Sequence, residues 1–339
     1  MKRPDSLSTA PELGKQDADA QLKQLIRLRM ILLVACLVGL IIAAPLWWNT
    51  RSFPLLPIAS WFPILPGPWD KVLFGYVLAS LLAACRFYRP SILFFLCATL
   101  FMFFEDQNRG QPWFYLYWVL MLLTILPDTA AIGGGRMVLS ALYLWSGIHK
   151  LNLKFFSQVP EWFVSPALDW GFPTGLVRLL QWTVSSAAAV EILIGVGFWI
   201  PKVRKTVLGA VILVHGAALI FLGPIGHNVN VVVWPWNVAM IGLVMVMFSV
   251  KYPVNLRQAL IDVRSSRPAI VVTFLVCLLP VLKYPGWWDQ AFSFALYSGN
   301  QARADIFVSE QFRERLPESM RVHVTDILAI NFAAFVRVA

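Results

Sequence analysis

The strongest constraint on the fold of this chain is a series of roughly nine apolar segments in its sequence. Short polar stretches separate these segments and hold most of the charged residues. Each segment reaches, or nearly reaches, the roughly 20 residues that a helix needs to cross the hydrocarbon core of a bilayer. We place them at 29–48, 71–86, 91–104, 113–127, 136–156, 182–200, 205–222, 231–250 and 268–284. The second, third and fourth are short, so eight spans are the alternative to nine. The sequence therefore predicts an all-α, polytopic integral membrane bundle of about nine transmembrane helices.

Composition supports a membrane protein. Hydrophobic residues make up 58% of the 339 residues and charged residues 14%, against about 45–50% and about 25% in soluble domains. The mean hydropathy of +0.68 argues against a soluble enzyme, a disordered protein or a nucleic-acid binder. The net charge of +10 therefore indicates membrane orientation and anionic lipid rather than nucleic acid.

Basic residues indicate the orientation of the chain. With the N-terminus inside, more than half of the 28 basic residues fall in cytoplasmic segments, and the outer loop 223–230 has none. This asymmetry is the usual mark of cytoplasmic loops. We therefore expect a cytoplasmic tail over 1–24, a transmembrane domain over 25–284 and an extracytoplasmic segment over 285–339, in a protein integral to the cytoplasmic (inner) membrane.

Two stretches do not have the pattern of spans. Residues 157–181 mix Trp, Pro and isolated acids, a composition that favours an interfacial cap over the outer mouth of the bundle. In the C-terminal segment we expect a small appendage, with a strand near 304–308 and a helix near 309–315.

The polar residues within the apolar segments are the candidates for function, because such residues are costly in a membrane. At about 100° per residue, Tyr143, Ser146, Gly147, Lys150 and Lys154 share one face of the fifth segment. Gly147 leaves room for a neighbouring helix or a flat ligand. An amine in apolar surroundings favours its neutral form, which makes Lys150 a candidate base. The alternative is a lysine that extends from the helix end to the headgroups.

Glu191 and His215 lie near the middle of the sixth and seventh segments, which a short turn at 201–204 connects. Their similar depth on antiparallel neighbours predicts a carboxylate–imidazole pair at the midplane, with a structural hydrogen bond as the alternative to a functional role. His149 faces another side of its helix than Lys150, and His227 suits a solvated loop. We expect no metal site, since no histidines have i, i+4 spacing and no cysteines have metal-ligand spacing.

The stretch Tyr143-Leu-Trp-Ser-Gly-Ile-His-Lys-Leu-Asn152 resembles a helix of the HTTM (horizontally transferred transmembrane) family, which includes the membrane domain of vitamin K-dependent gamma-carboxylase. Further compatible stretches follow the family's order. They are residues 109–117, His215 with Trp234-Pro-Trp-Asn237 after it, and residues 288–299. The resemblance implies a nine-helix bundle with an extracytoplasmic C-terminus.

In the carboxylase, a lysine at this position deprotonates a reduced naphthoquinone. The resemblance therefore implies that Lys150 is a quinol base and that a reduced quinone is the cofactor. Its pocket candidates are Tyr143, Ser146, Gly147 and Trp113. Trp113 departs from the family's pattern, because the carboxylase has a histidine there.

The leading hypothesis is thus a carboxylase-like or peptide-maturation membrane enzyme that uses Lys150 as a base near a quinol or lipid. The alternative is a non-catalytic membrane subunit that binds a partner complex or an exported peptide through its outer cap and tail. Expected partners are membrane lipids and such a peptide or complex, with no nucleic acid. An apolar cavity beside Lys150 favours the enzyme, and an ion-paired Lys150 in packed protein favours the subunit.

Overall fold

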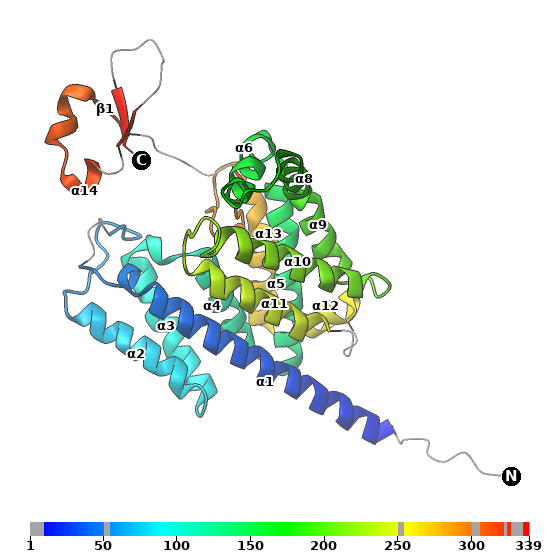
Figure 1. Cartoon of the computed structure of the whole chain (residues 1–339). Helices are drawn as coiled ribbons and strands as arrows, with labels where there is room; N and C mark the ends of the chain where they lie inside the picture. The colour runs from blue at the N-terminus through cyan, green and yellow to red at the C-terminus, as the bar shows by residue number, and fades with distance from the viewer. Residues whose placement is uncertain are drawn as a thin grey trace. The chain divides into compact units, whose positions relative to one another are not determined.

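The computed structural model describes residues 10–50, 55–249, 254–299, 306–321, 324–326 and 335–338. The chain divides into two units, Met1–Gly299 and Asn300–Ala339. Every regular element described in the first unit is a helix (Figure 1). The predicted all-helical class is therefore confirmed for this unit.

The first unit contains, in chain order, α1 (Ala10–Ile42), η1 (Ala44–Trp47), α2 (Trp69–Ala83), α3 (Tyr88–Glu105), η2 (Gln107–Arg109), α4 (Pro112–Thr124), α5 (Asp128–His149), α6 (Leu153–Val164), α7 (Pro166–Asp169), α8 (Thr174–Ser185), α9 (Ala187–Gly197), α10 (Arg204–Leu222), α11 (Val233–Phe248), α12 (Leu256–Arg264), α13 (Arg267–Leu278) and η3 (Leu279–Lys283). Each predicted apolar segment overlaps one of these helices. The short α12 lies between two predicted apolar segments and was not predicted.

Helix α5 is the centre of the bundle, since it packs against α1, α4, α9, α11, α12 and α13. Small residues allow these close approaches. A Cβ added to Gly133 would lie 2.9 Å from the Ala259 carbonyl oxygen of α12, and one added to Gly134 would lie 3.0 Å from Thr273 Oγ1 of α13. Glycine at helix contacts is the usual way for membrane helices to pack closely.

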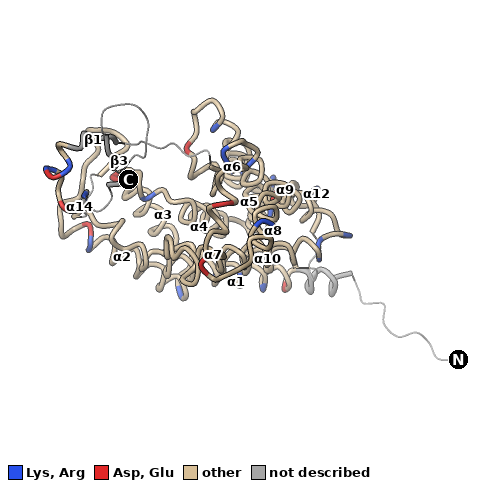
Figure 2. Tube along the Cα trace, turned by 45° about the horizontal axis from the view of Figure 1, so that its top comes forward, with Lys and Arg blue, Asp and Glu red and all other residues tan. Residues whose placement is uncertain are grey.

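Three described helical stretches are long and apolar enough to cross a membrane: Ala18–Ile42, Tyr88–Glu105 and Arg204–Leu222. The pair α8 and α9, bent by 43° at Ser186, adds a fourth if it counts as one broken span. Figure 2 shows that most of the helical unit carries neither acidic nor basic residues. These helices are compatible with a membrane protein, but nine spans are not confirmed, because the other helices are too short or not apolar enough by themselves.

The end of α5 differs from the expectation. The helix ends at His149 with Lys150 as its C-cap, whereas we expected it to continue to residue 156. Asn152 begins the next helix, because its Oδ1 accepts a hydrogen bond from Phe155 N at 2.9 Å. Lys154 therefore belongs to α6 and is exposed, so the prediction that it shares a helix face with Lys150 is wrong. Helices α6, α7 and the start of α8 occupy the region 157–181.

The second unit contains β1 (Ile306–Ser309), η4 (Glu310–Arg315), α14 (Glu318–Arg321), β2 (Val324–Asp326) and β3 (Phe335–Val338). The strands form an antiparallel sheet in the order β1-β3-β2, with Phe307 opposite Arg337. β1 and η4 lie where we expected a strand and a helix. The unit begins later than residue 285, because the segment before it belongs to the helical unit, where Asn152 Nδ2 donates to the Ser298 carbonyl at 2.8 Å.

Candidate active site

A cavity of about 420 Å³ lies among α5, α6, α8, α9, α10 and α11. This volume is within the range of small-molecule sites. Most of the lining is aliphatic or aromatic, and it includes Phe155, Val159 and Phe163 of α6. The six polar side chains that matter most for the chemistry are Tyr143, Ser146, Lys150, Glu191, His215 and Asn237.

Lys150 and Glu191 form an ion pair on the wall of this cavity. Lys150 Nζ lies 2.7 Å from Glu191 Oε2 and also donates to Ser146 Oγ at 2.8 Å. The two residues are only 5% and 9% exposed. The Lys150 amine also lies close to the last carbonyls of α5, since Nζ is 3.4 Å from the Ser146 carbonyl oxygen.

Two glycines bring these partners together. A Cβ on Gly147 of α5 would lie 2.6 Å from the Ala188 carbonyl oxygen of α9, and one on Gly195 of α9 would lie 2.8 Å from the Ser140 carbonyl oxygen of α5. Ser140 Oγ also donates to the Gly195 carbonyl at 2.6 Å. Gly147 therefore serves the contact between the two helices, which is one of the two uses expected for it, and it is not among the lining residues of the cavity.

Tyr143, His215 and Asn237 form a second polar group on the same cavity. The Tyr143 hydroxyl lies 2.6 Å from His215 Nε2, and His215 Nδ1 lies 2.7 Å from Asn237 Oδ1. Asn237 Nδ2 in turn donates to the Val233 carbonyl at 2.7 Å. The chain thus connects α5, α10 and α11.

The expected partners Glu191 and His215 line the same cavity, but each is bonded to another residue. The carboxylate of Glu191 accepts from Lys150, and the imidazole of His215 bonds to Tyr143 and Asn237. The physical reason is that α5 ends at this depth, so the Lys150 amine lies next to Glu191. Depth along α9 and α10 alone could not predict this arrangement, because Lys150, which competes with His215 for Glu191, lies at the end of α5.

The candidate Trp113 and the tryptophan Trp145 of α5 are not among the residues that line the cavity. Trp113 is buried away from the cavity lining, where it contacts the backbone of α1 so closely that a Cβ on Gly39 would lie 2.7 Å from its ring. Its assignment to the pocket is therefore wrong. Trp145 donates to the Cys277 carbonyl at 2.8 Å and stacks on His149, so this side of α5 faces away from Lys150, as expected for His149.

Aromatic stacking connects the loop at His227 to the cavity lining. His227 stacks on Trp162 with ring centroids 4.5 Å apart, and its Nε2 lies 2.7 Å from the Trp162 carbonyl oxygen. Tyr297 also stacks against Trp162, with ring centroids 6.1 Å apart, and lines the cavity. Burial raises the pKa of the Tyr297 phenol above its ordinary value, so this hydroxyl stays neutral.

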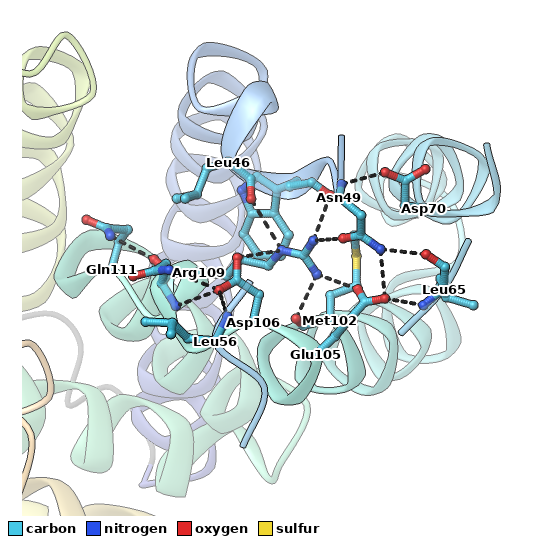
Figure 3. Close-up of polar contacts among 12 residues, drawn as sticks. Leu46, Asn49, Leu56, Leu65, Asp70, Met102, Glu105, Asp106, Arg109 and Gln111 are labelled. Carbon is cyan, nitrogen blue, oxygen red and sulfur yellow. Dashed lines mark hydrogen bonds and ion pairs between the residues drawn. The ribbon is translucent and has the colours of Figure 1, made fainter. Parts of the chain in front are cut away.

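A separate buried polar cluster surrounds Arg109 (Figure 3). Its guanidinium donates to Glu105 Oε2 at 2.7 Å and to Asn49 Oδ1 at 2.6 Å. Asn49 Nδ2 donates to Glu105 Oε1 at 2.9 Å, and the backbone N–H of Asn49 donates to Asp70 Oδ2 at 2.7 Å. These contacts join the ends of α1 and α3 to the start of α2, so we assign the cluster a structural role. The cluster was not predicted from the sequence, although the charged residues at 105–109 between two apolar segments were a usable signal.

The described residues contain no group of three or more His, Cys, Asp or Glu side chains that could hold a metal ion. No family model, curated protein or solved structure matches this chain.

Proposed function

We propose that this chain is a membrane enzyme of the HTTM type that uses Lys150 as a base on an apolar ligand such as a quinol or lipid. One observation carries the proposal: a largely apolar cavity of about 420 Å³ with a buried Lys150–Glu191 pair on its wall. Such a cavity with a few convergent polar groups is the usual form of a small-molecule site. Carboxylase-like chemistry and the maturation of an exported peptide are the two activities that follow from the HTTM resemblance.

The ion pair determines how the lysine acts. Lys150 paired with Glu191 holds its proton, so it becomes a base only after the proton moves to the carboxylate 2.7 Å away. In apolar surroundings, where charges are poorly solvated, a neutral amine beside a carboxylic acid competes with the ion pair. The neutral amine then accepts a proton from the ligand, and Ser146 Oγ orients the resulting ammonium.

The proposal includes the nine-span arrangement, with the N-terminus in the cytoplasm and the C-terminus outside the inner membrane. Its support is that each apolar segment of the sequence overlaps a helix and that α5, with 22 residues, is long enough to span. Helix α5 is largely surrounded by other helices. It therefore needs less apolar surface than a helix at the periphery, which faces lipid.

The test supplies a reduced naphthoquinone and oxygen to the purified chain in nanodiscs. Oxidation of the deprotonated quinol by O2 would place one oxygen atom in the ring as an epoxide and release the other as water, and the epoxide is measured by mass spectrometry. We expect epoxide above that of empty nanodiscs. Lys150→Met should abolish it, and Glu191→Gln should reduce it strongly, because Gln cannot take the proton. Lys154→Met is the matched control, since Lys154 is exposed on α6. Epoxide formation that survives Lys150→Met would refute the role of Lys150.

The alternative is a non-catalytic subunit or accessory protein that binds a partner complex or an exported peptide. The observation that favours it is the ion pair itself, because a short Lys150–Glu191 contact between α5 and α9 is also what a purely structural pair looks like. In that case Lys150→Met and Glu191→Gln would destabilise the fold, and the wild-type protein would form no epoxide.

A further inference from the structure

Asn237 determines which nitrogen of His215 carries a proton. Its Nδ2 donates to the Val233 carbonyl at 2.7 Å, one turn earlier on α11. Its Oδ1 must therefore point at His215 Nδ1, 2.7 Å away, and can only accept a hydrogen bond there. His215 Nδ1 thus carries a proton.

The Tyr143 hydroxyl must then act as a donor. A neutral imidazole with its proton on Nδ1 offers a lone pair at Nε2, and Nε2 lies 2.6 Å from the Tyr143 oxygen. The neutral form of the His215 imidazole is favoured, because the cavity lining is largely apolar and a charge is costly there. Since the Tyr143 proton is used toward His215, the lone pairs of its oxygen remain to accept from a ligand.

We infer that Tyr143, His215 and Asn237 form a binding site for the hydroxyl end of an apolar ligand, with Asn237 as the positioning residue for His215. The ligand hydroxyl donates to the Tyr143 oxygen, while the ligand body occupies the aliphatic part of the cavity. This inference rests on the proposed function in that it assigns a ligand to the same cavity. It deepens that function by naming a second polar contact that does not depend on Lys150.

The binding test compares 4-hexylphenol with 4-hexylanisole, in which a methyl group replaces the hydroxyl proton. Both are titrated into the full chain in nanodiscs, with empty nanodiscs subtracted. We expect the phenol to bind about three- to tenfold more tightly than the ether, the value of one neutral hydrogen bond. Tyr143→Phe should remove this preference. Equal binding of the two probes to the wild-type protein would overturn the inference.

A second measurement reads the histidine directly. In protein labelled with ¹⁵N-histidine, the imidazole shifts of His215, assigned by their loss in His215→Gln, should show a proton on Nδ1 and none on Nε2. Asn237→Leu should shift the proton toward Nε2 and weaken the phenol preference. Val238→Leu, at an exposed neighbouring position on α11, should change neither. A wild-type spectrum with the proton on Nε2 would contradict the argument.

The Lys150→Met variant separates this inference from the proposed function. We expect it to retain the phenol preference whatever it does to epoxide formation. Loss of the preference in Lys150→Met would assign the hydroxyl contact to Lys150 and overturn the role of Tyr143. A retained preference without any epoxide from the wild-type protein would instead leave a binding site and refute the quinol chemistry.

Discussion

Replacement of Arg109 by methionine should destabilise the helical unit more than the replacement of almost any other charged residue by a neutral one. The side chain is fully buried and makes hydrogen bonds to Glu105, Asn49 and the carbonyls of Met102, Trp47 and Leu46. Methionine has a similar length and offers none of these donors. Glu105 then remains buried without its cation, and the three carbonyl oxygens lose a donor.

The expected loss is about 3–5 kcal/mol in the free energy of unfolding, the usual cost of removing one partner of a buried ion pair. We expect the lower end of this range, because Glu105 Oε1 still accepts from Asn49 Nδ2 and from the Leu65 amide. Adding Glu105→Gln to Arg109→Met should recover part of the loss, since an uncharged amide is cheaper to bury than an unpaired carboxylate.

The assay is equilibrium unfolding in mixed detergent–dodecyl sulfate micelles, followed by circular dichroism. Arg89→Met is the control, because Arg89 is exposed in the first turn of α3 and should change the stability by less than about 0.5 kcal/mol. A loss for Arg109→Met no larger than that of the control would refute the structural role of the cluster. So would a double variant less stable than Arg109→Met alone.

Two further outcomes test the packing and the orientation. Gly147→Leu should separate α5 from α9, because even a Cβ at this position would lie 2.6 Å from the Ala188 carbonyl oxygen. The unfolding temperature should then fall by several degrees. Gly216→Ala, which meets nothing within 4 Å, should leave that temperature unchanged or slightly raised, and similar losses in both variants would contradict the contact. In a cysteine-free background, an impermeant thiol reagent added to intact cells should label a cysteine at position 300 and not one at Val203. Equal labelling would overturn the orientation, and Asn300 itself lies outside the described residues.

The sequence by itself predicted the features that depend on local pattern. Long apolar segments have to bury their backbone hydrogen bonds as helices, so composition along the chain predicts a helix in each of the nine segments, whereas α7 and α12 lie outside them. The strand at 306–309 and the helical turn after it were also predicted, because both depend on neighbouring residues. The sequence likewise marked Lys150, Glu191, His215 and Tyr143 as unusual, since each is a polar residue in an apolar segment.

Only the tertiary structure decided which of these polar residues are partners. Glu191 bonds Lys150 rather than His215 because Gly147 and Gly195 bring α5 against α9 and because α5 ends at His149. Neither the closeness of two helices nor the rotation between them is encoded in the hydropathy of either one. The same limit explains Trp113, which has the right residue type for a pocket but faces α1. A hydrogen bond forms only when donor and acceptor are placed to within a few tenths of an ångström of the right distance. For helices far apart in the sequence, the packing of the whole bundle sets that distance.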